Sequence, residues 1–252
     1  MLLLDAGNSR CKWAWVEQGE WLHQGVLDNA VKAEWEALKD FLFRLAAPEK
    51  VLVSNVAGTA AVENITELCA HWNCSPKYIL AQTQQCGVRN SYAQAEQLGS
   101  DRWAALIAAW QRVQGACLVV NCGTATTVDA LSSSGEFLGG LILPGLDLMR
   151  QSLKSGTAQL NLESGKPGNF PRNTADAITS GALHATTGAI LHQYRLLSEL
   201  GQARCIVSGG AAGSLMPYLE LKALLVENLV LHGLQVIGQN CSTMNDKEMV
   251  AR

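Results

Sequence analysis

The stretch LLLDAGNSRCKW, residues 2–13, decides how the fold is interpreted. Three leucines are typical of a short buried strand, yet this strand runs into the carboxyl group of Asp5 and then into a Gly-Asn-Ser turn at 7–9. Gly7 permits a tight turn, and the amides of such a turn can form an anion-binding nest. Lys12 adds a positive charge suited to phosphate, and Asp5 is suited to magnesium beside phosphate oxygens. The alternative is a β-hairpin in which the aspartate has no special role.

A second stretch, LVVNCGTATTVDALSSSGEF at residues 118–137, has the same layout as residues 2–21. Each begins with three apolar residues, continues through a polar residue and a nearby glycine, and ends in Gly-Glu followed by an aromatic residue. Each therefore predicts a strand, a tight turn, a returning strand and a third strand. A pattern that occurs twice predicts two similar halves.

Helical and strand patterns alternate after each hairpin. The first half predicts helices at 31–46 and 61–72 and strands at 50–58 and 77–80. The second half predicts a long helix at 173–200, a strand with a Gly-rich turn at 203–213, and a strand or helix start at 229–234. This order is typical of an α/β protein with two sheet domains. We place the domains at residues 1–114 and 115–252.

The composition is that of an ordinary globular protein, with 48% hydrophobic and 16% charged residues among 252. The net charge of −3 and the absence of a basic run argue against nucleic-acid binding. The eight cysteines form no Cys-x-x-Cys pair, so we expect reduced thiols and no zinc site. No signal peptide and no apolar stretch of membrane-spanning length is recognisable. We therefore expect a cytoplasmic protein.

Three motifs together resemble those of the type III pantothenate kinases: Asp-x-Gly-Asn-Ser-x-x-Lys at 5–12, Gly-Ser-Asp-Arg at 99–102 and Gly-Thr-Ala-Thr-Thr at 123–127. The resemblance extends over residues 1–235. It implies an α/β fold of two duplicated ribonuclease-H-like domains, as in actin and the sugar kinases, with a central nucleotide cleft. It also implies a homodimer that uses ATP to phosphorylate pantothenate to 4′-phosphopantothenate, the first step of coenzyme A biosynthesis.

The resemblance assigns residues to each ligand. ATP is contacted by Asp5, Ala6, Gly7, Asn8, Ser9, Arg10, Cys11, Lys12 and Thr124. The pantothenate pocket is formed by Tyr92, Gly99, Ser100, Asp101, Arg102 and Thr174. Asp101 is the general base, and Asp5 holds Mg²⁺ directly or through water. The pantothenate carboxylate requires a cation, for which Arg102 and Arg89 are the candidates.

Several of these residues also have a purely structural explanation. Ser100 or Asp101 can be the N-cap of the helix that begins with RWAALIAAW, and Thr174 can cap the next long helix. Tyr92 can be a surface residue of a polar loop. Asp129, on the returning strand of the second hairpin, either points into the cleft or only takes part in hairpin pairing.

Asn121 stands where the family often has an aspartate that binds a monovalent cation. Asparagine keeps a carbonyl oxygen and loses the negative charge, so we expect a weakened K⁺ or NH₄⁺ site. Two other functions remain open. One is a kinase for another small hydroxyl substrate on the same fold, and the other is a non-catalytic accessory protein of gene regulation.

Overall fold

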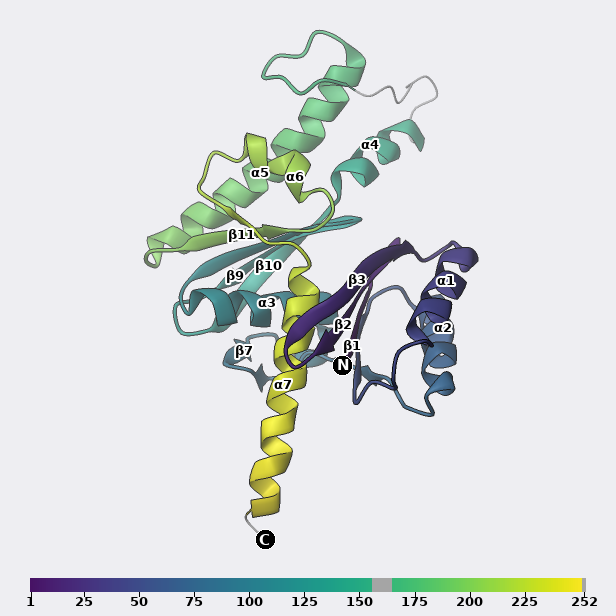
Figure 1. The fold of residues 1–252 in the computed structure, drawn as a ribbon. Helices are drawn as coiled ribbons and strands as arrows, with labels where there is room; N and C mark the ends of the chain where they lie inside the picture. The colour runs from purple at the N-terminus through teal and green to yellow at the C-terminus, as the bar shows by residue number, and fades with distance from the viewer. Residues whose placement is uncertain (156–164, 251–252) are drawn as a thin grey trace. The chain divides into compact units, whose positions relative to one another are not determined.

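The computed structural model describes residues 1–155 and 165–250, which form two compact units (Figure 1). The first unit comprises residues 1–112 and 228–252, and the second comprises residues 113–227. Among the described residues, no helix is both long enough and apolar enough to cross a membrane.

The sheet of the first unit confirms the hairpin predicted at the N-terminus. Its strands lie in the order β3 (Glu20–Asp28), β2 (Arg10–Glu17), β1 (Leu2–Ala6), β4 (Val51–Asn55) and β5 (Lys77–Tyr78). The first three strands are antiparallel neighbours, whereas β4 runs parallel to β1 and β5 runs parallel to β4. Because β1 and β4 are parallel, their polar C-terminal residues lie side by side at one edge of the sheet.

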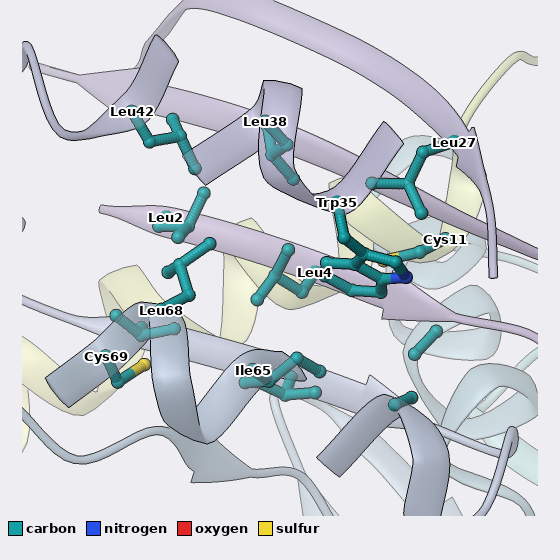
Figure 2. Close-up of a cluster of buried hydrophobic side chains, with 14 of the residues drawn as sticks. Leu2, Leu4, Cys11, Leu27, Trp35, Leu38, Leu42, Ile65, Leu68 and Cys69 are labelled. Atoms are coloured by element: carbon teal, nitrogen blue, oxygen red, sulfur yellow. The ribbon is translucent and has the colours of Figure 1, made fainter. Parts of the chain in front are cut away.

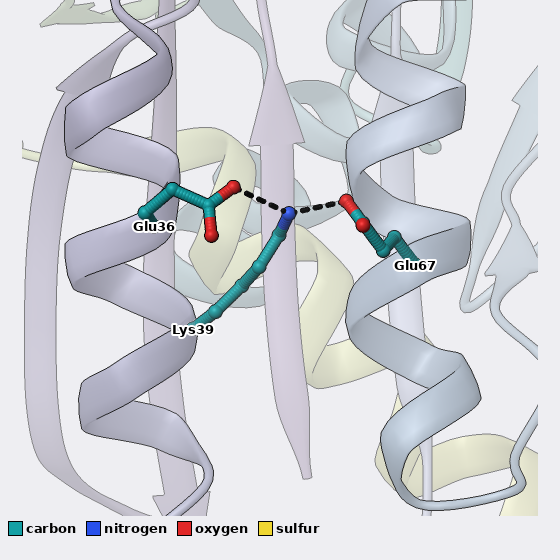
Figure 3. Close-up of polar contacts among 3 residues, drawn as sticks. All are labelled: Glu36, Lys39 and Glu67. Atoms are coloured by element: carbon teal, nitrogen blue, oxygen red, sulfur yellow. Dashed lines mark hydrogen bonds and ion pairs between the residues drawn. The ribbon is translucent and has the colours of Figure 1, made fainter.

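Helices α1 (Lys32–Leu42) and α2 (Thr59–His71) pack with one face of this sheet. Alternate strand residues such as Leu2 and Leu4 point into that core and meet Trp35 and Ile65 (Figure 2). The two helices are also joined by buried Lys39, whose ammonium group pairs with Glu36 at 3.1 Å and with Glu67 (Figure 3).

Helix α7 (Leu229–Val250) contacts the opposite face of the same sheet, and α3 (Ser100–Val113) packs against α7. Gly233 brings α7 against the backbone of α3, because a Cβ there would lie 1.9 Å from the Ala104 carbonyl oxygen. Gly238 does the same against the sheet, where a Cβ would lie 2.5 Å from Leu52 Cδ1. The segment predicted as a strand or helix start at 229–234 is therefore a helix of the first unit.

The compact units differ from the predicted domains mainly at the C-terminus, where residues 228–252 group with the first unit, and the internal boundary lies at 112/113 and not at 114/115. The physical reason is the close packing of α7 at Gly233 and Gly238. Sequence continuity alone had assigned the segment to the second half.

The second unit repeats the strand plan of the first. Five consecutive strands of its seven-stranded sheet match β3, β2, β1, β4 and β5 one for one. They are β10 (Glu136–Pro144), β9 (Ala125–Leu131), β8 (Cys117–Cys122), β11 (Arg204–Ser208) and β12 (Leu224–Leu225). The pairing is antiparallel up to β8 and parallel beyond it, as in the first unit. The predicted duplication is thus confirmed at the level of topology.

Helices and short elements complete both units. In the second unit, α5 (Thr174–Glu199) and α6 (Ala212–Leu215) contribute to a core with β8 and β11, and α4 (Leu146–Ser155) contacts α5. The short 3₁₀ helix η2 (Met216–Tyr218) follows α6. In the first unit, the hairpin of β6 (Gln84–Gln85) and β7 (Val88–Asn90) and the 3₁₀ helix η1 (Ala95–Gln97) precede α3.

Candidate active site

The turn between β1 and β2 is exposed to solvent, and hydrogen bonds fix its conformation. Asn8, Ser9 and Arg10 are exposed, and the amide of Gly7 donates to the carbonyl oxygen of Arg10 at 3.0 Å. Asn29, which sequence reasoning missed, fixes both sides of the turn. Its amide side chain donates to the Gly7 carbonyl oxygen, and its backbone N–H donates to the Ser9 carbonyl oxygen at 3.0 Å.

Two of the residues assigned to ATP face away from the open turn. Ala6 and Cys11 are fully buried in the core with α1 and α2. Burial also raises the pKa of the Cys11 thiol far above its ordinary value. Any contact of these two residues with a nucleotide therefore has to come from the backbone.

Asp5 lies directly opposite Lys12 across the β1–β2 pair. Burial and, to a smaller extent, the negative charge of Asp101 raise the pKa of Asp5 to about 7, against the opposing effect of the positive charge of Lys12. Two carboxyl groups from segments far apart in sequence are thus close enough to interact. Carboxylates brought together out of water are typical of functional sites, where a cation or a proton compensates the repulsion.

The start of α3 fixes Asp101. The amide of Trp103 donates to the Gly99 carbonyl oxygen at 2.9 Å, and Asp101 Oδ1 accepts from the Arg102 amide at 2.8 Å. A Cβ at position 99 would lie 2.7 Å from Asp101 Oδ1, so only glycine leaves room for this carboxylate. Asp101 lies inside the first turn and satisfies one amide there. Such an interaction is compatible with a catalytic role.

Arg102 and Tyr92 are in contact with each other. Arg102 is only 6% exposed, and its Nη1 donates to the Tyr92 hydroxyl oxygen at 3.3 Å. Buried Asn90 shapes the loop that carries the tyrosine: its Oδ1 accepts from the Tyr92 amide at 3.0 Å, and its Nδ2 donates to the Ala95 carbonyl oxygen at 3.1 Å. Tyr92 is therefore half-buried and held in place, and it is not a free surface residue.

In the second unit, the turn between β8 and β9 contains Thr124, which is exposed. Two glycines pack against this region. A Cβ at Gly145 would lie 2.3 Å from the Gly123 carbonyl oxygen, and the Gly145 amide donates to the Thr124 carbonyl oxygen at 2.8 Å. Gly209, with φ +98°, similarly abuts the backbone of Cys122. The Gly-rich turn after β11 was noticed in the sequence, whereas the contact of Gly145 was not.

Asn121 is half-buried at the end of β8, in register with Ser208 of β11 and Thr127 of β9. Asp129 is buried on β9 between Val119 and Gly140 of the neighbouring strands. The backbone of Asp129 thus takes part in the sheet, and its carboxyl group is buried.

Thr174 is the first residue of α5 and does not cap it. The N-cap is Asn173, whose side-chain oxygen accepts from the Asp176 amide at 2.9 Å. The capping interpretation of Thr174 is therefore wrong by one residue. Thr174 instead lines a hollow of about 840 Å³ in the second unit, together with Met149 and Ser152 of α4 and Ile178 of α5.

In the parts of the chain that the structure describes, no group of three or more His, Cys, Asp or Glu side chains is arranged to hold a metal ion. It fits magnesium, which typically takes one or two carboxylates and completes its shell with phosphate oxygens and water. Half-buried Asp5, next to the exposed turn between β1 and β2, is a donor of that kind.

Solved structures share this fold. A protein described as a 2-dehydro-3-deoxygalactonokinase from Sinorhizobium meliloti matches with a TM-score of 0.57 at 14% identity, over 95% of this chain and 98% of its own. A protein described as a Baf family transcriptional activator from Campylobacter jejuni matches with a TM-score of 0.57 at 21% identity, over 96% and 100%. These identities show the fold alone. It is that of the actin-like and sugar-kinase ATPases, built from two ribonuclease-H-like halves.

Sequence comparison identifies the family within this fold class. The family model of type III pantothenate kinase matches residues 1–196. The type III pantothenate kinase of Nitrosospira multiformis is 46% identical over 257 residues, which cover 100% of this chain and 95% of that protein. The chain belongs to the type III pantothenate kinase family, whose members phosphorylate pantothenate with ATP on the way to coenzyme A.

Proposed function

We propose that Asp101 is the general base of this kinase and that the β1–β2 turn, with Asp5 and Lys12, binds the phosphates of ATP. The observation that carries the proposal is the pair of carboxyl groups, Asp5 and Asp101, beside the exposed turn between β1 and β2. A kinase needs this combination, because one group must take a proton while the phosphates and their cation are held nearby.

The chemistry assigned to Asp101 is a single proton transfer. As the hydroxyl oxygen of pantothenate forms a bond to the γ-phosphorus and the bond to the β-phosphate bridging oxygen breaks, the carboxylate of Asp101 accepts the hydroxyl proton. The Arg102 amide, 2.8 Å away, holds the carboxylate in this orientation, and the absence of a Cβ at Gly99 leaves room for it. The products are ADP and 4′-phosphopantothenate.

Asp5 is the proposed contact for magnesium, directly or through water. A magnesium ion there would neutralise charge on the phosphates during transfer. Asp5 is suited to this because its negative charge, unfavourable in the free protein, is compensated once a cation is present. Lys12, directly opposite on β2, supplies a point charge for a phosphate. The turn that is proposed to contact the phosphates consists of Gly7, Asn8, Ser9 and Arg10. Any contact of ATP with Ala6 or Cys11 is proposed to involve only their backbone atoms.

The proposed pantothenate contacts are Tyr92, Gly99, Arg102 and Thr174, with Ser100 acting through its backbone. The carboxylate of pantothenate is assigned to Arg102, because its guanidinium is buried beside the Tyr92 hydroxyl, where an incoming anion would be little screened. Arg89 is exposed and is the weaker candidate.

Thr124 is the proposed contact of the second unit with ATP, and the Ser-Gly-Gly turn at 208–210 allows a nucleotide to approach the backbone. Asn121 is proposed as a weakened position for K⁺ or NH₄⁺. Its half-buried carbonyl oxygen remains a ligand of the right type, but it lacks the charge that strengthens such a site.

We also propose a cytoplasmic homodimer that does not bind nucleic acid. Support for the dimer comes from the apolar surface of α5, where Leu196 is 44% exposed, and from the hollow at Thr174, which is lined mostly by apolar side chains. The net charge of −3 disfavours DNA. The resemblance to a Baf family protein shows the fold alone and does not favour a regulatory function.

A substrate panel tests the proposal most directly. The purified protein is incubated with Mg²⁺-ATP and, in separate reactions, with pantothenate, hexoses, 2-keto sugar acids and short hydroxy acids, and ADP release is measured. We expect turnover with pantothenate to exceed that with every other compound by orders of magnitude. Comparable or faster turnover of a sugar or sugar acid would favour the alternative, a kinase for another small hydroxyl substrate.

A further inference from the structure

We propose that Ser54 is a positioning residue, which sets the orientation of Asp101 through a buried hydroxyl pair with Ser100. The inference rests on the proposed role of Asp101 as the base. Ser54 and Ser100 come from distant parts of the sequence, and their hydroxyl oxygens lie 3.0 Å apart. Ser54 is fully buried and Ser100 is 8% exposed.

The position of Ser54 in the sheet relates it to the phosphate-binding strand. It is the register partner of Asp5 across the parallel β1–β4 pair, so the two side chains project from the same face of the sheet. Leu52, two residues earlier on β4, projects from that same face and meets α7 at Gly238. The face is thus apolar toward α7 and ends in two polar groups, Asp5 and Ser54.

Burial makes the hydroxyl pair costly to break. A buried hydroxyl without a hydrogen-bond partner loses its hydration and gains nothing in return. Ser54 and Ser100 satisfy each other, which ties the end of β4 to the first turn of α3. Ser100 therefore uses its side chain inward, toward the sheet, and not for direct contact with substrate.

The fixed position of Ser100 also constrains the next residue, Asp101. Successive residues of a helix differ in direction by about 100°, so fixing Ser100 against β4 fixes the direction in which Asp101 leaves the helix. The Arg102 amide then holds the carboxylate itself, and Gly99 leaves room for it. The hydroxyl pair sets the position of the helix turn, and these local contacts set the rotamer.

Small displacements of a catalytic base lower the reaction rate strongly. A shift of about 1 Å from a productive geometry can cost about 100-fold. Ser54→Ala removes one hydroxyl and leaves that of Ser100 buried without its partner. We expect kcat to decrease about 10-fold or more. The KM for ATP should stay within about twofold, because the β1–β2 turn contains neither serine.

The decisive measurement is kcat for Ser54→Ala in two backgrounds, the natural protein and Asp101→Asn. If Ser54 acts through Asp101, its loss lowers kcat in the first background and changes it less than about twofold in the second. Ile65→Val, which removes one buried methylene group from the core with α2, controls for lost stability and should leave kcat unchanged (Figure 2).

Three different results would overturn the inference. An equal decrease in both backgrounds, or no decrease in the first, would show that Ser54 does not act through Asp101, while the proposed function stands. A near-normal kcat of Asp101→Asn alone would refute the base assignment, and the positioning role with it. If Ser54→Ala does not fold, Ser100→Ala removes the same hydrogen bond from the helix side and is measured in the same way.

Discussion

Replacing Asp5 by asparagine is expected to stabilise the ligand-free protein, and to do so increasingly between pH 4 and pH 7. Burial, with the charge of Asp101, raises the pKa of Asp5 to about 7 from an ordinary value of 3.8. The folded protein therefore holds this proton more tightly than the unfolded chain does. The stability that the proton contributes is complete below the unfolded pKa and is lost as the pH rises through the folded pKa. Asparagine is neutral throughout and avoids that loss.

The magnitude follows from the size of the shift. Each unit of pKa difference corresponds to about 1.4 kcal/mol, so the difference between variant and natural protein reaches at most about 4 kcal/mol above pH 8. Asp5 is half-buried and Lys12 lies opposite, and water near the turn screens the repulsion. We therefore expect a measured difference of about 1–3 kcal/mol.

The assay is urea unfolding of both proteins from pH 4 to pH 8.5, without ATP and without divalent cations. Asp40→Asn, which replaces an exposed aspartate of α1, is the matched control and should give no pH-dependent difference. The reasoning is refuted if the effect of Asp5→Asn is the same at every pH, or if the natural protein becomes the more stable of the two as the pH rises.

Four further predictions concern activity and assembly. Asp101→Asn should lower kcat by about 10²–10⁴-fold while the protein stays folded by circular dichroism; near-normal turnover would leave Asp101 a purely structural role. Gly145→Ala, whose Cβ would meet the Gly123 carbonyl oxygen at 2.3 Å, should raise the KM for ATP about 10-fold in steady-state kinetics, and Gly168→Ala, with open space around it, should not. Asn121→Asp should increase stimulation by K⁺ in a titration at fixed ionic strength; a natural protein nearly inactive without K⁺ would contradict the weakened site. Sedimentation equilibrium should give a dimer, and a fully active monomer would oppose that assignment.

The hairpins could be predicted because their signal is local. Three apolar residues, a turn with glycine and a returning strand lie within about twenty residues, and the same pattern occurs twice. The helix at 229–234 could not be distinguished from a strand, because a short apolar run fits both. Its place in the first unit depends on Gly233 and Gly238, whose close contacts with Ala104 and Leu52 span more than a hundred residues.

The site residues that lie in recognisable motifs could be predicted. The residues that hold these motifs in place by contacts from another segment of the chain were missed. Asn29, Ser54 and Gly145 each hold a motif in place from a distant segment, and nothing in their local sequence marks that contact. The cap of α5 shows a different limit. Asn173 and Thr174 are adjacent residues that both favour N-caps, so propensity alone does not decide between them.

The return of the chain to its first unit has a consequence for synthesis. Residues 229–240 cover the face of the first sheet that carries Leu3 and Leu52, yet a ribosome makes them after all of the second unit. While residues 113–227 emerge, that apolar face has no helix α7 to cover it and is open to aggregation or to chaperones. Folding of the nascent chain should therefore finish with the half that began first, and a stalled chain that ends near residue 227 should be captured by a chaperone even though its second unit is complete.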